Sequence, residues 1–323
     1  MKQSARMNFM QIDQPPTESL RFSLTPRALA EALGVSESSI KRWADEGEIQ
    51  VSRTAGGHRR IALEEALRFA RASRLRLAHP EALGLSDLVL AGAAQVNASE
   101  CAERLFELLR TGAAGEARGL LLTWYLEGRP LADILDGPIR GAMARVGALW
   151  EHGSQGIFVE HRATDIVLQA LGQLRMLLPA SPPGAPRAVG GAPSGDPYLV
   201  PSLGAATLLA STGWGVTHLG PQTPRDALLE AIAAVSPRLV WWSLSSESGA
   251  VAAALDLPAV LAAVEQQDAF LVVGGRAAAG MVVAEHSRLV RVSSMSELDA
   301  FARGLSASTR PVSVGAGVAA GIA

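Results

Sequence analysis

The sequence has very little cysteine: Cys101 is the single thiol in 323 residues. One thiol cannot form an intramolecular disulfide, a Cys-x-x-Cys redox pair or a zinc site built on several thiolates. The first twenty residues lack the apolar run of a signal peptide. The longest apolar stretch, residues 250–264, is interrupted by Asp256 and Pro258, so no membrane span is expected. These absences predict a soluble, cytoplasmic protein without a membrane partner.

Net charge is also small, at -2, but it is unevenly distributed. Residues 1–80 carry 13 Lys and Arg against 9 Asp and Glu, which leaves 16 against 22 for the remainder. Contact with a nucleic acid is therefore expected only near the N-terminus. The sequence contains no GxSxG, P-loop or HExxH motif and no acidic pair spaced for acid–base work, so an enzyme is not expected.

Clusters of proline and glycine divide the chain into units. The predicted order is a disordered arm (1–19), a compact helical unit (20–80), a four-helix bundle (96–180), a Rossmann-like α/β unit (186–306) and a disordered tail (307–323). Pro80 and the Gly-Leu-Ser at 84–86 predict a hinge after the first unit. The predicted fold class is multidomain: an all-α winged helix, then a helical bundle, then a doubly wound parallel sheet.

The first unit has the pattern of a helix-turn-helix followed by a wing. Thr25 and Pro26 predict the start of one helix, Gly34 its end, and Ser36 the start of the next. The second helix carries the polar residues expected to enter a major groove: Ser38, Ser39, Lys41 and Arg42. A glycine turn follows, with residues expected at the backbone of double-stranded operator DNA: Arg53, Thr54, Gly57, His58, Arg59 and Arg60. Arg59 and Arg60 are expected to hold phosphates. The alternative is a solvated basic hairpin after an ordinary helix pair.

Two segments carry a family resemblance: SLTPRALAEALGVSESSIKRWADEGEI and RTAGGHRRI. Together they resemble the MerR family of transcriptional regulators over residues 23–72. The resemblance implies a winged-helix reader that binds a two-fold symmetric operator as a dimer. No clean heptads follow Arg76, so the dimerising coiled coil usual in that family is not expected here.

The second half predicts alternating strands and helices. The expected strands are Arg187–Gly190, Gly215–Leu219, Leu239–Ser243, Leu271–Gly274 and Leu289–Val292. The expected helices are Leu203–Ser211, Arg225–Val235 and Leu257–Gln267. Ligands of such sheets bind at the carboxyl ends of the strands, which are rich in Gly, Ser and Pro here. An ordinary flavodoxin-like domain is the alternative.

The spacing of small and polar residues carries a second resemblance. Asp196-x-Tyr198-x-x-Pro201, Ser243-Leu-Ser245 and Gly274-Gly275 are similar to the fingerprint Asp-x-His-x-x-Gly, Ser-x-Leu, Gly-Gly of cobalamin-binding domains. The resemblance implies that Asp196 and Tyr198 meet a cofactor from below. It also implies that Ser243, Ser245, Gly274 and Gly275 line a slot for the nucleotide tail of that cofactor.

Residues 23–305 as a whole resemble the CarH and LitR group of light-responsive repressors. The bundle motif of that group is Trp-x9-Glu-His, and Trp150, Glu160 and His161 match its spacing. The resemblance implies that these three residues cover the chromophore from above. It also implies a homo-oligomer, a dimer or tetramer, which leaves its operator when light breaks the cobalt–carbon bond of adenosylcobalamin. On composition alone, Trp150 would be a core residue and Glu160 and His161 a surface pair.

Two departures from this resemblance leave the cofactor open. The fingerprint histidine is Tyr198, and Glu151 stands where such photoreceptors have a second cobalt-binding histidine. Adenosylcobalamin bound without a protein ligand, another tetrapyrrole, and a vestigial pocket controlled by a protein partner all remain possible. The other tetrapyrroles are a linear bilin such as biliverdin, or haem. Cys101 is the one residue that could attach a bilin covalently, but a buried thiol used for packing is favoured.

Overall fold

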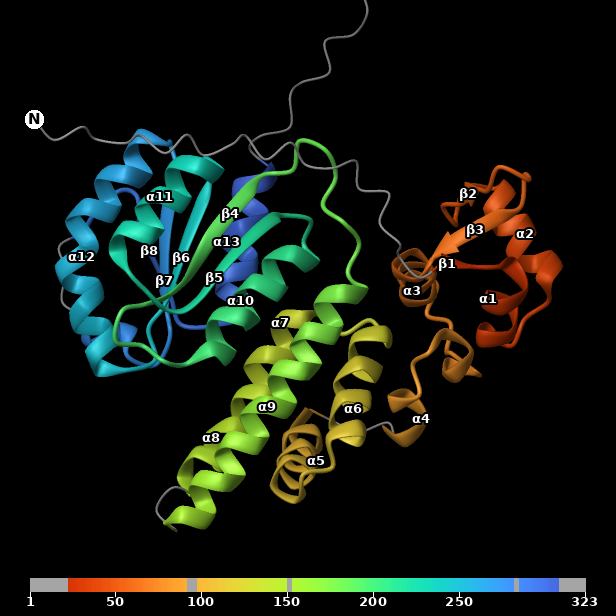
Figure 1. The fold of residues 1–323 in the computed structure, drawn as a ribbon, viewed down its shortest axis with the longest axis horizontal. Helices are drawn as coiled ribbons and strands as arrows, with labels where there is room; N and C mark the ends of the chain where they lie inside the picture. The colour runs from red at the N-terminus through yellow and green to blue at the C-terminus, as the bar shows by residue number, and fades with distance from the viewer. Residues whose placement is uncertain (1–22, 92–97, 150–152, 282–284, 308–323) are drawn as a thin grey trace, which may run out of the picture.

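The computed structural model describes residues 23–91, 98–149, 153–281 and 285–307. The predicted disordered arm (1–19) lies outside these residues, and so does the predicted tail beyond Ala307. The described chain forms a small N-terminal unit, a central group of helices and a C-terminal sheet covered by helices (Figure 1). This confirms the predicted multidomain fold class.

The N-terminal unit is a winged helix-turn-helix. Its elements are β1 (Ser23–Leu24), α1 (Pro26–Leu33), α2 (Glu37–Asp45), β2 (Ser52–Arg53), β3 (Arg59–Ala62) and α3 (Leu63–Ala72). The predicted caps are present: the Ala28 N–H donates to Thr25 Oγ1 at 3.1 Å, and the Ser39 N–H donates to Ser36 Oγ at 3.2 Å. Gly34 ends α1 with a φ of 65°, a conformation in which glycine is favoured.

The segment after this unit is packed and does not form an open hinge. It contains a short 3₁₀ helix (Pro80–Leu83) and α4 (Asp87–Ala91). Leu83 and Leu85 are 7% and 5% exposed and belong to the same hydrophobic cluster as the bundle core. The prediction of a hinge at residues 80–86 was wrong. Pro and Gly predict only that the chain changes direction here, and burial of two leucines at the turn holds the segment against the bundle.

The central helices form the predicted bundle. They are α5 (Ala98–Thr111), α6 (Ala114–Leu126), α7 (Leu131–Ile134), a π-helical turn (Leu135–Ile139), α8 (Arg140–Ala148) and α9 (Ser154–Leu177). The π-helical turn contains Pro138, which lacks the N–H that a regular helix needs at this position. Its buried residues Leu135 and Ile139 keep α7 and α8 packed as one bent helix.

The C-terminal unit is a five-stranded parallel sheet in the order β5-β4-β6-β7-β8. The strands are β4 (Arg187–Pro193), β5 (Gly215–Thr223), β6 (Leu239–Ser243), β7 (Phe270–Gly274) and β8 (Leu289–Val292). One face packs against α10 (Leu199–Ser211) and α13 (Met295–Ala307), and the other against α11 (Arg225–Val235) and α12 (Glu247–Gln266) (Figure 1). A further 3₁₀ turn spans Ala278–Gly280.

The main error of the secondary-structure prediction is helix α12, which was expected to begin at Leu257 and begins ten residues earlier, at Glu247. Ser246 caps it by accepting from the Gly249 N–H at 3.0 Å, and Pro258 lies within it. Pro258 is exposed, so water can satisfy the carbonyl that the missing N–H leaves unpaired. The helix is long and apolar enough to cross a membrane, but Ala253, Leu257, Val260 and Val264 pack it against the sheet.

The bundle and the sheet share one hydrophobic cluster. It runs from Leu105 and Leu171 in the bundle to Leu209 on α10 and Leu305 on α13. The winged unit has a separate core around Leu29, Ile40 and Phe69. Ala32, Leu63 and Leu67 of the winged unit also belong to the shared cluster, so one side of the winged unit packs onto the bundle.

Candidate nucleic-acid interface and ligand site

Helix α2 presents the predicted polar face to solvent. Ser38, Lys41 and Arg42 are exposed, whereas Ile40 is fully buried in the core of the winged unit. Ser39 is half-buried and its hydroxyl lies 2.9 Å from Ser36 Oγ, so it helps to cap the helix. Three of the four predicted residues are thus exposed, and Lys41 Nζ lies 2.8 Å from Glu37 Oε1 on the same helix.

The wing is the turn between β2 and β3, which pair antiparallel with Arg53 opposite Arg59. The Thr54 N–H donates to the His58 carbonyl at 2.9 Å, and Gly57 has a φ of 77° that favours glycine. Arg53, Thr54 and His58 are exposed, and Arg60 is half-buried. The turn therefore projects cations beside the exposed face of α2, as predicted.

Arg59 differs from this expectation. Its guanidinium donates to Asp45 Oδ1 at 2.6 Å and to the Lys41 carbonyl at 3.1 Å, and its side chain is 21% exposed. These contacts join the wing to the last turn of α2. In this conformation Arg59 positions the wing, and the cations left for phosphates are Arg53 and Arg60.

At the carboxyl edge of the sheet, Asp196 joins two loops. It is fully buried, and its oxygens accept three backbone N–H groups: Tyr198 at 3.1 Å, Ser245 at 2.5 Å and Ser246 at 3.0 Å. A Cβ on Gly249 would lie 2.6 Å from Asp196 Cβ, so this approach requires glycine. Asp196 therefore fixes the loop after β4 against the loop after β6. Its oxygens are already satisfied, so it supports the site and does not face a ligand.

Tyr198, at the position of the fingerprint histidine, is 41% exposed. The guanidinium of Arg276 lies 4.7 Å from the centre of its ring, and Arg276 Nε donates to the Ser245 carbonyl at 2.5 Å. Arg276 directly follows Gly274 and Gly275, which the sequence predicted at this edge. The Tyr198 and Arg276 pair therefore occupies the mouth of the predicted slot.

The predicted slot residues lie together at this edge. Ser243 is 7% exposed and pairs with Gly274, and Ser245 is 6% exposed. Gly275 has a φ of 113°, and a Cβ there would overlap the carbonyl of Leu244. The edge is therefore lined by hydroxyls and bare backbone.

On the bundle side, Glu160 and His161 form a loose pair on α9, with 3.5 Å between His161 Nε2 and Glu160 Oε2. The Glu160 side chain is 18% exposed and accepts from Thr164 Oγ1 at 3.0 Å, whereas the His161 side chain is 72% exposed. Of these two residues, His161 is the one that is open to solvent. Trp150, the third residue, lies outside the described residues, as does Glu151.

Cys101 is fully buried in the bundle core, and burial raises the pKa of its thiol. Its surroundings fit the favoured prediction of a thiol used for packing. They do not suit covalent attachment of a ligand, which needs an accessible thiolate.

A half-buried histidine, His218, lies on β5 below the sheet edge. His218 lies 3.0 Å from Ser202 Oγ and stacks on Trp241, with 6.3 Å between the ring centres. Burial and the charge of Arg175 lower the pKa of His218 from 6.5 to about 4. His218 is therefore neutral at physiological pH and belongs to the support of the site.

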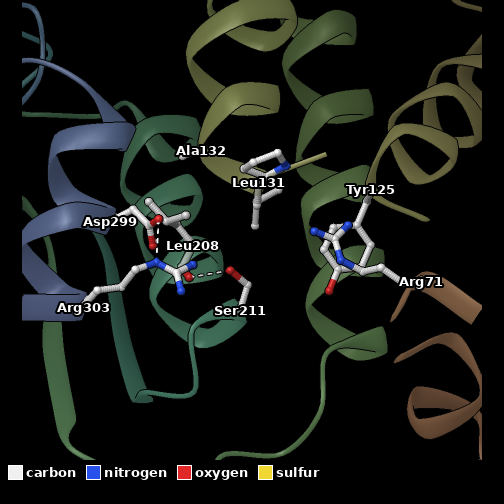
Figure 2. A pocket seen from close by; sticks show the side chains of 9 residues that line it. Arg71, Tyr125, Leu131, Ala132, Leu208, Ser211, Asp299 and Arg303 are labelled. Atoms are coloured by element: carbon white, nitrogen blue, oxygen red, sulfur yellow. Dashed lines mark hydrogen bonds and ion pairs between the residues drawn. The ribbon is translucent and has the colours of Figure 1, made fainter. Parts of the chain in front are cut away.

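A cavity of about 90 Å³ lies where the winged unit, the bundle and the sheet unit meet (Figure 2). On one side, Arg71 of α3 donates to the Arg129 carbonyl at 2.9 Å and lies 4.1 Å from the ring centre of Tyr125. On the other side, Asp299 of α13 pairs with Arg303 at 2.9 Å. Arg71 Nη1 and Asp299 Oδ1 are both buried, and neither has a hydrogen-bond partner among the residues that the structure describes. Hydrogen bonding around this cavity is thus incomplete among the described residues.

Comparison with known proteins places two of these units in families. Residues 23–74 match the family model of a helix-turn-helix domain, and residues 101–175 match that of a B12 binding domain. The chain is 28% identical over 229 residues to the HTH-type transcriptional repressor CarA of Myxococcus xanthus, covering 68% of this chain and 75% of that protein. It is a helix-turn-helix transcriptional regulator with a B12 binding domain.

This result confirms the prediction of a MerR-type regulator with a cobalamin-type domain, and it supports a regulator over an enzyme. The monomethylamine corrinoid protein of Methanosarcina barkeri shares the fold, with a TM-score of 0.50 at 15% identity, over 64% of this chain and 98% of that one. The matched B12 model covers the bundle of the regulator, and the structural likeness extends to its sheet.

Sequence reasoning missed three residues of these sites: Arg276, Trp241 and Arg71. Arg276 could have been noticed because it directly follows the Gly-Gly pair. Trp241 lies two residues before Ser243, so strand alternation places it on the same face. Nothing in the local sequence marks Arg71, because its partners lie more than fifty residues away.

Proposed function

We propose that this regulator is a light-responsive repressor. In this proposal its winged unit binds operator DNA, and its sensor half binds a tetrapyrrole between α9 and the carboxyl edge of the sheet. The observation that carries the proposal is that four small residues lie together at one edge of the sheet: Ser243, Ser245, Gly274 and Gly275. The bundle that precedes this sheet matches the family model of a B12 binding domain. Small side chains and bare backbone permit the close approach of a flat ligand.

The polar groups at this edge suit the periphery of a tetrapyrrole. Tyr198 and Arg276 can donate hydrogen bonds to its substituents, and His161 stands exposed on the bundle side. When bound, such a group supplies absorption of visible light. The residues do not supply a cobalt ligand from below, because a neutral phenol is a poor one.

A regulator of this kind needs a coupling between ligand and reader. The shared core of bundle and sheet, and the contact of Arg71 with the connection between α6 and α7, offer a physical route. The proposal includes a homo-oligomer, a dimer or tetramer, on a two-fold symmetric operator in the cytoplasm. Change of oligomeric state on illumination would then release the DNA.

The test uses the full-length regulator incubated separately with adenosylcobalamin, biliverdin and haemin, then desalted. An operator is first selected from a random DNA pool, and binding is measured by fluorescence anisotropy in the dark and after illumination. Size-exclusion chromatography follows the oligomer. We expect one pigment to be retained and operator affinity to change at least tenfold on illumination.

No retained pigment in any of the three incubations would refute the tetrapyrrole sensor. Operator binding with no retained pigment would favour the second candidate, a regulator with a vestigial pocket controlled by a protein partner. If a pigment is retained but light has no effect on DNA binding, the claim of control by light is refuted and the claim of a tetrapyrrole site stands.

A further inference from the structure

On the face of the sheet that packs against α10, two successive rows of residues differ in the size of their side chains. Ser243 and Gly274 are paired in the row at the carboxyl edge. In the next row His218 pairs with Gly190, Gly190 with Trp241, and Trp241 with Val272. Successive rows on one face of a strand are two residues, or roughly 7 Å, apart. The small-residue row is therefore followed directly by a row that contains an indole.

Trp241 closes the sheet interior behind Ser243. It is 2% exposed, and its ring lies across Gly190, where a Cβ would be 2.5 Å from Trp241 Cδ2. His218 stacks beside it. Its Nε1 is buried and has no hydrogen-bond partner within the described part of the chain, so packing holds the ring there. A nucleotide tail, with phosphate, ribose and bicyclic base, is longer than one row and would need the space that this indole fills.

The mouth of the slot carries a positive charge. Arg276 is exposed and, within the part of the chain that the structure describes, forms no ion pair. One of its five N–H donors is used by the Ser245 carbonyl. Guanidinium groups bind carboxylates with two parallel hydrogen bonds. Propionate side chains, as in bilins and haem, supply carboxylates, whereas the side chains of a corrin ring are neutral amides.

Within the proposed function, we infer that the site takes a tetrapyrrole that carries carboxylates and no nucleotide tail. Trp241 excludes the tail, and Arg276, stacked on Tyr198, binds a carboxylate. Linear bilins and haem share this chemistry, and the arms of the experiment separate them. The B12-type fold is retained, and its specificity differs from that of a cobalamin site.

The first experiment measures dissociation constants of the full-length regulator by absorption titration. The probes are biliverdin, biliverdin dimethyl ester, haemin, cobinamide and hydroxocobalamin. We expect biliverdin or haemin to bind at least tenfold more tightly than hydroxocobalamin, and the ester at least tenfold more weakly than biliverdin. Tighter binding of biliverdin identifies a bilin site, and tighter binding of haemin identifies a haem site.

Hydroxocobalamin bound more tightly than both would overturn the inference, and so would cobalamin bound in the base-off form with its tail inserted. Either result leaves the proposed tetrapyrrole sensor standing. Failure of every probe to bind would instead refute the proposed function. The two claims therefore fail on different results.

The second experiment tests the charge at the mouth. Arg276→Gln should weaken binding of the preferred carboxylate pigment about tenfold, and binding of its ester should change less than twofold. Arg187→Gln is the matched control, because Arg187 is exposed at the start of β4, at the opposite edge of the sheet. An equal loss for acid and ester would show that Arg276 supports the fold and does not recognise the carboxylate.

The third experiment tests the closing indole. Trp241→Ala should raise affinity for hydroxocobalamin relative to cobinamide by at least tenfold, because space for the tail is opened. Trp241→Phe keeps the interior filled and should preserve the wild-type ratio, so it controls for loss of stability. If Trp241→Ala does not fold, the affinities of the wild-type protein for cobinamide and hydroxocobalamin still test whether the tail is excluded. Equal affinities for the two would overturn the exclusion of the tail.

Discussion

The arginines of the wing differ in what they already contact. Arg59 is neutralised by Asp45, whereas Arg53 is exposed and donates only to the Gly57 carbonyl, at 3.3 Å. A cation that contacts a phosphate releases about one counterion on binding, so loss of that contact reduces the magnitude of the logarithmic salt slope by roughly one. Arg53→Ala should show this change. Arg59→Ala should weaken operator binding by loosening the wing, with a smaller change of slope.

Anisotropy titrations at several salt concentrations with the selected operator separate these effects. Arg76→Ala, which removes an exposed cation outside α2 and the wing, is the control. If Arg59→Ala lowers the slope as much as Arg53→Ala, Arg59 leaves Asp45 on binding and holds a phosphate, as the sequence alone predicted.

His218 makes stability depend on pH. Its pKa is about 4 in the folded protein and 6.5 as the reference value, so the unfolded state binds more protons between these two values. The free energy of unfolding should therefore fall as pH is lowered from 6.5 toward 4. Because the ring is only partly buried, solvent screening reduces the loss between pH 7 and 5 to about 1 kcal/mol.

Urea unfolding of the wild type and of His218→Gln at pH 7, 6 and 5 measures this dependence. The variant should lose less stability than the wild type over this range, because glutamine does not titrate. Parallel losses in the two proteins would show that other groups cause the acid sensitivity.

At the scale of elements, the loops after β4 and β6 are held together by one carboxylate. Asp196→Asn keeps the size of the side chain but replaces an acceptor by an NH₂ group that faces backbone N–H donors. Leaving such buried groups unsatisfied costs about 1–3 kcal/mol. We expect a lower melting temperature together with weaker pigment retention. Asp268→Asn, at a side chain that is 80% exposed, should change neither.

The secondary structure was predictable where local signals agree. The run LVWWS predicted β6 to the residue, and Thr25, Ser36 and Gly34 predicted the ends of α1 and α2, because caps and apolar runs act within a few residues. Pro258 led to the wrong start for α12. Proline is tolerated inside this helix because it lies on the solvent side, and that position depends on how the helix packs on the sheet.

The site was predictable in part. The glycines and serines of the slot were found because the family spacing is fixed by the ends of β6 and β7. The contacts of Arg59 with Asp45 and of Arg276 with Tyr198 join residues far apart in sequence, and only tertiary packing brings them together. The same holds for the depth of the slot, which depends on where the ring of Trp241 lies.

At the scale of the whole molecule, the cavity of Figure 2 lies where the winged unit, the bundle and the sheet unit meet. Arg71 of α3 is the link. Its guanidinium donates to the carbonyls of Gly128 and Arg129, and it lies against the ring of Tyr125 (Figure 2). Burial lowers the pKa of Arg71, yet a guanidinium remains charged at any physiological pH. Among the described residues, its buried Nη1 has no hydrogen-bond partner, which weakens this link. A weakly held link can be broken by a small movement of the bundle.

Arg71→Met keeps the apolar stem and removes the link. Operator affinity of the pigment-free protein should change less than threefold, because the substitution lies outside α2 and the wing. The ratio of operator affinities with and without pigment should fall toward one. Coupling between the pigment site and the DNA-binding surface needs a connection whose conformation depends on both, and the substitution removes it. Anisotropy titrations of both forms measure this ratio, with Arg76→Met, an exposed position of the same segment, as control. A ratio that stays at the wild-type value would show that the signal reaches the reader through oligomer assembly and not through this junction.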